Sequence, residues 1–320
     1  MRLARHNSVF LPVFVLVLGS ALALAPALHA AIESAPVSPH NPYDIQLAGL
    51  VAALQNAPAP QAAVLLKRIY ELRDFLDNPD AVVLPLSEVA LDGKRHPLVR
   101  DEALHWLALL DVHENRLDAA RAAFVQLGFV RQWAIVGPFT ARPGLDGELG
   151  PEQGFRAGRE YADGAALRRW RVVPDFGPHG AVDLSDFYPQ AAPAVVYAST
   201  SIFTEAPRIL ALRIGADSAL AVFVNGKQVL RDDAENPRGF DQHPVGVELH
   251  KGWNAVVLKL YRRDQGPWSF ALRLTGLNGG GLQLNTSATE PLEPAVEVTW
   301  PVAIPVDLVA VAQQIAQSTP

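Results

Sequence analysis

The chain has 320 residues, of which 49% are hydrophobic and 19% charged, and this is enough apolar material for two domains with their own cores. It contains no cysteine, which excludes disulfides, thiolate metal sites, a thiol nucleophile and lipid attachment through an N-terminal cysteine. The formal net charge of -6 argues against nucleic-acid partners, because the electrostatic term that dominates such binding would be repulsive.

Residues 1–30 have the pattern of a secretory signal peptide. Arg2 and Arg5 precede an apolar run over 9–25, Pro26 interrupts that run, and small residues follow. This order predicts cleavage after Ala30 and export to the periplasm, the cell envelope or the medium. The alternative is an uncleaved membrane anchor, for which the run is slightly short, and only through it would the protein contact a membrane. The absence of cysteine from an exported chain suggests a bacterial envelope protein.

Residues 31–44 lack periodicity and are interpreted as a linker, and a helical domain is expected over 45–128. A third helix is predicted over 98–112 with Pro97 in its first turn, and a fourth over 116–127 with Asn115 as its cap and Gly128 as its stop. Two earlier apolar stripes comprise Ile45, Leu47, Leu50, Val51 and Leu54, and then Ala63, Leu66, Ile69, Tyr70 and Phe75.

The last two helices carry small residues at the positions expected to face each other, including Ala119, Ala120, Ala122 and Ala123. The stretch over 103–128 resembles one tetratricopeptide-type helical hairpin. A single hairpin cannot bury its own apolar face, so the preceding helices or the next domain must cover it.

A β-domain is expected over 129–285, because short runs there alternate apolar and polar residues with a period of two. Asn225-Gly226 predicts a two-residue hairpin turn after 219–224, and Gly252-Trp253-Asn254 is interpreted as a second antiparallel return. A tight turn is expected at 137–139, and a long surface excursion over 140–165. The residues predicted to share the core face are Leu210, Leu212, Ile214, Val245, Val247, Leu249, Val256, Leu258, Leu260, Trp268, Phe270, Leu272 and Leu274.

Residues 286–320 are interpreted as an extended tail in which a helix begins at 306–317. The predicted fold class is therefore α+β and multidomain: a small tetratricopeptide-like helical domain followed by an antiparallel jelly-roll β-sandwich.

Several stretches of the β-domain, in this order, carry a further resemblance: WAIVGPF at 133–139, RIGADSALAVFVNGKQV at 213–229, DQHPVGVELHKGWNAVVLKLY at 241–261 and WSFALRL at 268–274. Together they resemble the galactose-binding-like jelly-roll module of large exported bacterial proteins that combine tetratricopeptide repeats with transglutaminase-like domains. The resemblance implies a β-sandwich used for binding or for domain organisation. It transfers no papain-type nucleophile, since the chain has no cysteine, and no individual ligand residue.

Motifs of catalysis are missing from the sequence: there is no His-Glu-x-x-His, no Gly-x-Ser-x-Gly and no Gly-x-x-x-x-Gly-Lys. No cofactor and no catalytic residue are therefore expected. The acidic residues Asp217, Asp232, Asp233, Glu235 and Asp241 leave calcium open as an alternative, although their spacing fits no EF-type loop. Asp217 and Asn225 are more simply expected to hydrogen-bond the backbone of neighbouring turns.

The candidate ligand site comprises Arg231, Arg238 and Asp241, which flank one polar loop where guanidinium groups and a carboxylate could hold a polar ligand. The alternative is that either arginine pairs with Asp241 only to brace the loop. The tryptophans Trp133, Trp170 and Trp268 are expected in the core, and Trp253 at the end of the sandwich. Arg213, Lys259 and Arg273 are expected on the wet face of the sheets.

The leading hypothesis is thus a non-catalytic binding or scaffolding module of the bacterial envelope that recognises a glycan or a protein partner. The alternative is the accessory part of a glycan-active or transglutaminase-like enzyme. Two carboxylates facing one cleft at glycosidase spacing would favour the enzyme.

Overall fold

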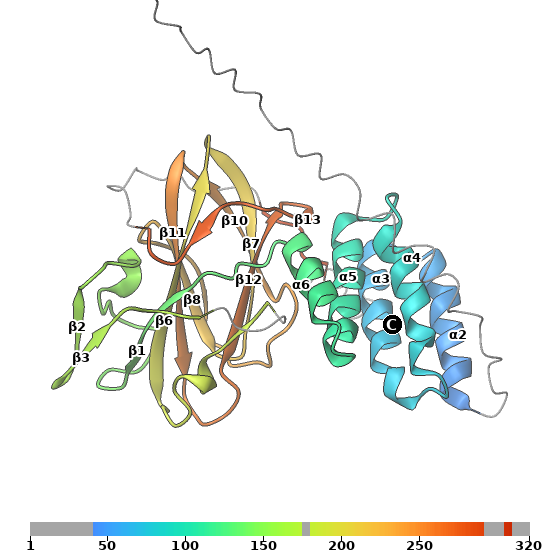
Figure 1. The fold of residues 1–320 in the computed structure, drawn as a ribbon, viewed down its shortest axis with the longest axis horizontal. Helices are drawn as coiled ribbons and strands as arrows, with labels where there is room; N and C mark the ends of the chain where they lie inside the picture. The colour runs from blue at the N-terminus through green and yellow to red at the C-terminus, as the bar shows by residue number, and fades with distance from the viewer. Residues whose placement is uncertain (1–40, 175–179, 291–303, 309–320) are drawn as a thin grey trace, which may run out of the picture.

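The computed structural model describes residues 41–174, 180–290 and 304–308. The predicted signal peptide, most of the predicted linker and the part of the predicted C-terminal helix after Leu308 lie outside these residues. Figure 1 shows a helical part beside a β-sandwich, with α6 next to the sandwich and α2 at the far side. Among the described residues no helix has the length and the apolar character needed to cross a membrane.

The helical part consists of α2 (Pro42–Gln55), α3 (Ala59–Glu71), α4 (Val83–Leu91), α5 (Pro97–His113) and α6 (Leu117–Gln126), with 3-10 turns η1 (Arg73–Phe75) and η2 (Pro79–Val82). Pro97 is in the first turn of α5 as predicted, and the His96 side chain accepts a hydrogen bond from the Leu98 N–H. Gly128 ends α6 with φ +83°, where a Cβ would lie 2.3 Å from the Leu274 carbonyl oxygen. Only glycine combines that backbone conformation with so close an approach.

Two expectations for the helices are wrong, and one helix was missed. The N-cap of α6 is Arg116, which makes no side-chain capping bond, while Asn115 lies before it in the left-handed region at φ 59°. Ile45 is exposed because α2 buries Leu47 and Leu54, and Phe75 is exposed in η1, after α3 has ended at Glu71. The helix α4 had not been predicted.

The contact between α5 and α6 uses two of the four alanines predicted for it, because Ala120 and Ala123 are buried whereas Ala119 and Ala122 are exposed. Ala108 of α5 and Ala120 and Ala123 of α6 are buried in one cluster with Phe124 and Leu127. Alanine at these positions lets the two helices approach closely.

The sandwich contains two antiparallel sheets. The larger has the order β4 (Arg171–Val172), β1 (Ala134–Phe139), β6 (Ala194–Thr204), β11 (Gly252–Arg262), β8 (Ala219–Val224) and β9 (Lys227–Asp232), with β14 (Thr286–Ser287) also on β6. The smaller has the order β10 (His243–Leu249), β7 (Arg208–Ala216), β12 (Ser269–Gly276) and β13 (Gly279–Gly281), with β5 (Val182–Asp183) also on β12.

The core between the sheets contains the residues that the period of two had predicted. All thirteen are buried in this cluster or, in the case of Val245, packed against it. Trp133 and Trp268 are 1% and 0% exposed, which confirms their assignment to the core, but Trp170 is only partly buried and packs against Tyr161 on the outer face of the larger sheet, so its assignment to the core is wrong. The period of two predicted those thirteen residues correctly because successive side chains of a strand point to opposite faces of the sheet.

Two local expectations in the β-domain are corrected by the structure. The strand β1 runs on through Gly137 and a cis Pro138 to Phe139, with a register shift against β6, so 137–139 is an irregular strand and not a turn. The residues 140–165 are not a free excursion. They contain η3 (Pro151–Gln153) and β2 (Glu160–Asp163), which pairs with β3 (Ala166–Arg169), and Leu145 and Tyr161 are buried on the outer face of the larger sheet.

Candidate binding site

The three residues of the predicted ligand site lie in three different contacts. Asp241 accepts hydrogen bonds from Arg273, Nε to Oδ1 and Nη2 to Oδ2, each at 2.6 Å. Its Oδ2 also lies 3.6 Å from Nη1 of Arg213. The carboxylate of Asp241 is therefore occupied by two arginines of the smaller sheet.

The two predicted arginines bond elsewhere. Arg231 donates to Asp233 at 2.7 Å and to Asp146 at 2.9 Å, and these bonds raise the pKa of the exposed guanidinium. Arg238 donates from Nε to the Ser269 hydroxyl at 2.8 Å. Neither arginine forms the bracing pair with Asp241 that had been the alternative.

The acidic residues considered for calcium are dispersed over separate contacts. Asp217 accepts from the backbone N–H groups of Arg238 at 2.6 Å and Ser269 at 3.2 Å, so it binds backbone that is distant in the chain and not the neighbouring turn that was expected. In the part of the chain that the structure describes, no three potential metal-ligating side chains come together.

Arg213 and Arg273 are 2% and 1% exposed, so their expected position on a wet face is wrong. The two arginines are direct partners on β7 and β12, on the face of the smaller sheet that the helices cover. Arg273 donates to Asp101 of α5 at 3.0 Å and to the Leu127 carbonyl at 3.1 Å. Burial opposes the charge of Arg273, but Asp241 and Asp101 outweigh it and raise the pKa of the guanidinium.

Aromatic rings complete this contact between helices and sandwich. The Phe240 ring lies 4.2 Å from the His105 ring in a stacked arrangement, and the Arg273 guanidinium lies 4.5 Å from the Phe240 ring centre. Burial, with Arg273 adding to it, lowers the pKa of His105 to about 3, so the imidazole is neutral at physiological pH. Burial and the Asp241 charge raise the pKa of Glu102 to about 8.

Perturbed pKa values of this kind often mark active sites. Here, however, the groups that perturb them are contacts between the two parts of the fold. Glu102 accepts a hydrogen bond from the Trp106 indole at 2.9 Å, and His105 packs among aromatic rings. We therefore assign these groups to the packing of α5 on the sandwich.

Lys259 is likewise buried and not on a wet face, at 1% exposure. Its ammonium donates to the Leu145 carbonyl at 3.0 Å and the Gly147 carbonyl at 2.7 Å, and Glu152 lies 3.8 Å away. Burial lowers the pKa of Lys259. Lys259 thus holds residues 145–152 onto the sheet.

Trp253 differs from the core tryptophans because it is only partly buried. Its ring centre lies 5.3 Å from that of Phe203, its direct partner across β11 and β6. Asn285 follows in register on the other side of Phe203, since Thr286 pairs with Ile202 and the Phe203 N–H bonds the Asn285 carbonyl at 2.9 Å. Side chains in register on adjacent strands share one face. The end of the larger sheet therefore presents two aromatic rings beside an exposed amide.

Two asparagines from separate turns hold the backbone on either side of Trp253. Asn225 and Gly226 have φ 51° and 80°, which confirms the predicted hairpin turn between β8 and β9. Asn225 Nδ2 donates to Asn254 Oδ1 at 3.0 Å, and Asn225 Oδ1 accepts from the Ala255 N–H at 2.9 Å. Fully buried Asn254 also bonds the backbone of His250 and Gly252.

The Gly252-Trp253-Asn254 return itself differs from expectation, because β10 and β11 lie in different sheets and do not pair. It is a crossover between sheets. The sequence had singled out both turns, but nothing in it showed that they bond to each other.

We refer to Trp253, Phe203 and Asn285 as the aromatic platform.

No family model and no curated protein matches the chain. Among solved structures, a family 35 carbohydrate-binding module from an environmental isolate is similar at 20% identity, over 31% of this chain and 74% of that chain, with a TM-score of 0.23. A family 35 module from Clostridium thermocellum has 17% identity over 26% and 71%, with a TM-score of 0.21. The β-glucosidase from Kluyveromyces marxianus in complex with glucose has 11% identity over 45% and 16%, with a TM-score of 0.29. Scores this low assign neither a family nor a ligand.

Proposed function

We propose that the chain is a non-catalytic binding protein whose sandwich holds a carbohydrate against Trp253. The observation that carries this proposal is the aromatic platform, in which a partly exposed indole and a phenyl ring adjoin an exposed amide. An aromatic face can pack against the C–H face of a sugar ring, while an adjacent amide can bond its hydroxyl groups. The Asn225–Asn254 bond supports the proposal because it orders the backbone that carries the indole before any ligand arrives.

Affinity electrophoresis of the mature chain through gels that contain single soluble polysaccharides, chosen with a glycan array, tests this function. We expect Trp253→Ala to abolish the retardation that the wild type shows in a binding polysaccharide. Trp170→Ala, at another partly buried tryptophan outside the platform, is the matched control and should leave retardation unchanged. Thermal melts of both variants monitor folding. Retardation that survives Trp253→Ala in a folded protein would contradict the proposal, as would a Trp253-dependent protein partner without any glycan binding.

The loop with Arg231, Arg238 and Asp241 stays a second proposed ligand site. The exposure of both arginines supports it, whereas Asp241 could act there only through Arg273 and Arg213. Arg238→Ala should weaken a polar ligand by about 1.5–3 kcal/mol with the melting temperature nearly unchanged. A shifted melt with unchanged affinity would remove this site.

We further propose that the protein is exported and functions in the bacterial envelope, and that α5 and α6 correspond to one tetratricopeptide-type unit. The signal-like sequence over 1–30 supports export, and the close packing of Ala108 with Ala120 supports the helical unit. N-terminal sequencing of the exported product should begin at Ala31. Recovery of intact Met1 in the membrane fraction would contradict cleavage.

A further inference from the structure

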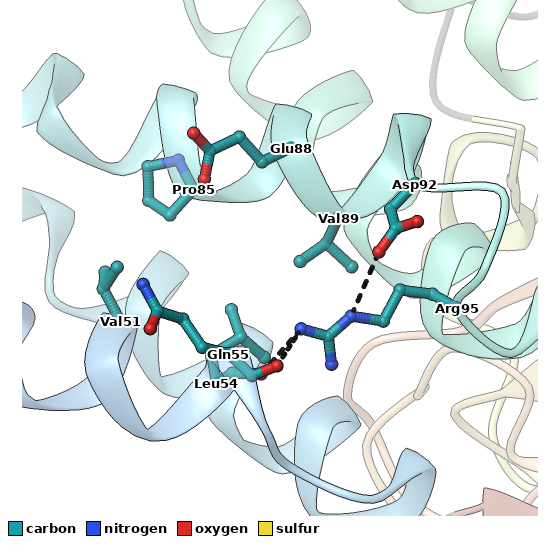
Figure 2. A pocket seen from close by; sticks show the side chains of 8 residues that line it. All are labelled: Val51, Leu54, Gln55, Pro85, Glu88, Val89, Asp92 and Arg95. Carbon is teal, nitrogen blue, oxygen red and sulfur yellow. Dashed lines mark hydrogen bonds and ion pairs between the residues drawn. The ribbon is translucent and has the colours of Figure 1, made fainter.

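A pocket of about 170 Å³ lies between α2 and α4, on the part of the helical domain away from the sandwich (Figure 2). Its floor is apolar and is made by Val51 and Leu54 of α2 and by Pro85 and Val89 of α4. Its rim is polar and is made by Gln55, Glu88, Asp92 and Arg95. Sites for whole small-molecule ligands usually enclose roughly 300–1,000 Å³, so this pocket has room for one side chain.

The one cation at the rim is already engaged. Arg95 Nη2 donates to the carbonyls of Leu54 at 2.9 Å and Gln55 at 2.7 Å, where α2 ends, and Arg95 Nε lies 3.6 Å from Asp92 Oδ2. Arg95 therefore closes one side of the pocket and offsets the charge of Asp92. The Leu54 carbonyl also accepts from the Ala57 N–H at 3.4 Å, and together these bonds satisfy carbonyls at the C-terminus of α2.

Glu88 supplies the remaining charge. Its side chain is exposed, and it forms no ion pair and no hydrogen bond with the residues that the structure describes. Figure 2 shows its carboxylate beside Pro85 across the opening from the Gln55 amide. The pocket thus combines an apolar floor with one free negative charge at its mouth. A long aliphatic side chain that ends in a cation matches both features.

We propose that this pocket binds a lysine side chain of a partner protein, with the aliphatic stem on Val51 and Val89 and the ammonium at Glu88. The partner must supply the lysine, because the segments 31–40, 175–179, 291–303 and 309–320 contain neither lysine nor arginine. An ammonium suits a single carboxylate with an adjacent amide oxygen, whereas the planar guanidinium favours two parallel acceptors. This site is separate from the aromatic platform and does not depend on the carbohydrate proposal.

Methyl NMR of the mature chain tests the site with Nα-acetyl-lysine N-methylamide as the probe and Nα-acetyl-norleucine N-methylamide as the uncharged control. The lysine probe should shift the methyl signals of Val51, Leu54 and Val89 at millimolar concentration, and the norleucine probe should bind more weakly. Glu88→Gln should weaken the lysine probe about two- to fivefold at low ionic strength, as expected for one exposed charge pair. Added salt should weaken the wild type in the same direction.

Two further variants separate the site from general charge effects. Glu71→Gln changes an exposed glutamate on α3 that does not line the pocket, and it should leave the probe affinity unchanged. Val51→Phe should fill the pocket and abolish binding, and its folding is checked by thermal melting. The proposal is overturned if the lysine probe leaves these methyl signals unshifted, if norleucine binds equally, or if Glu71→Gln weakens binding as much as Glu88→Gln.

Discussion

Gly226 is the second residue of the hairpin turn between β8 and β9, and the first residue of that turn, Asn225, bonds Asn254 next to Trp253. Its φ of +80° lies in the left-handed region, and a Cβ would lie 2.5 Å from the Gln153 side-chain oxygen. Gly226→Val should therefore lower the free energy of unfolding by about 1 kcal/mol or more, since β-branched residues strongly disfavour positive φ. Chemical denaturation measures the loss. Gly266→Val is the control, because its Cβ would meet open space, and equal losses in both variants would contradict this account.

Glu102 gives the protein a pH dependence of stability. Its pKa of about 8 in the folded state lies above the usual glutamate value of 4.5. The folded chain therefore binds more protons than the unfolded chain between these pH values, so the contribution of Glu102 is complete at low pH and is lost as pH rises towards 8. We expect Glu102→Gln to be more stable than the wild type at pH 8.5, by an amount on the order of 1 kcal/mol for a partly exposed group, and to show a smaller loss between pH 5.5 and 8.5.

Denaturation curves at the two pH values test this expectation. Glu71→Gln serves as the matched control, because Glu71 is exposed and pairs only with Lys67 among the described residues. A wild type and a Glu102→Gln variant with parallel pH profiles would show that Glu102 is ionised in the folded protein at neutral pH.

The period of two correctly identified which face of each strand bears the core, but it could not show what lies on the other face. Arg213 and Arg273 occupy the positions where an open sandwich has solvated side chains, and a cationic residue there indicates water. In this protein Asp101 of α5 and Asp241 of a loop reach those arginines from far away in the chain. Only tertiary packing decides between a wet face and a buried ion pair.

At the scale of elements, the segment 140–165 depends on Lys259 for its attachment to the sheet. Lys259→Met should preserve the apolar stem but remove the bonds to Leu145 and Gly147 and leave the buried Glu152 without a neighbouring cation. We expect limited proteolysis within 140–150 to become faster by tenfold or more, as roughly 1.4 kcal/mol of lost local stability implies, before the sandwich unfolds.

Lys251→Met is the control for this experiment, because Lys251 is exposed at the turn before β11. Its cleavage pattern should match the wild type. If Lys259→Met left cleavage within 140–150 unchanged, the segment would be held by its apolar contacts alone.

Local signals explain why some elements were found and others missed. Pro97 and Gly128 mark the start of α5 and the end of α6, because proline is favoured in the first turn of a helix and glycine just after its end. By contrast, α4 follows directly from η2, its N-cap Val82 forms no side-chain cap, and Pro85 lies within its first turn. A short helix without boundary signals has no pattern that separates it from a loop. Gly137-Pro138 led to the wrong prediction of a turn, because this dipeptide is typical of turns but here lies inside the paired strand β1.

At the scale of the whole molecule, Arg273 links the helices to the sandwich. We expect the wild type to unfold in one transition, with helical circular dichroism and tryptophan fluorescence changing together. Arg273→Met should lower the free energy of unfolding by about 3–5 kcal/mol, because Asp101 would stay buried without its cation and Asp241 would keep only its longer contact with Arg213. In this variant the helical circular dichroism and the tryptophan fluorescence should change in two separate transitions. Arg169→Met, in an exposed pair with Glu160, should cost less than about 1 kcal/mol.

Coincident transitions in Arg273→Met, at an unchanged midpoint, would show that the contact between the two parts does not depend on this arginine. A double-mutant cycle with Asp101→Asn measures the coupling directly. We expect a coupling energy of about 0.5–3 kcal/mol, as for residues in one buried network.

The segment 304–308 returns from the sandwich to the helical part. Leu308 is 8% exposed within the core of the helices, and Arg213 of the smaller sheet bonds the Val306 carbonyl at 2.9 Å. The core that begins at Leu47 is therefore completed by a residue that the ribosome adds some 260 positions later. During synthesis the apolar core of the first helices stays partly exposed until the sandwich has left the ribosome and Leu308 can pack against them. The helical core therefore cannot be completed before the sandwich has been synthesised. We expect a chaperone that binds exposed apolar helices to act on the N-terminal part during this interval.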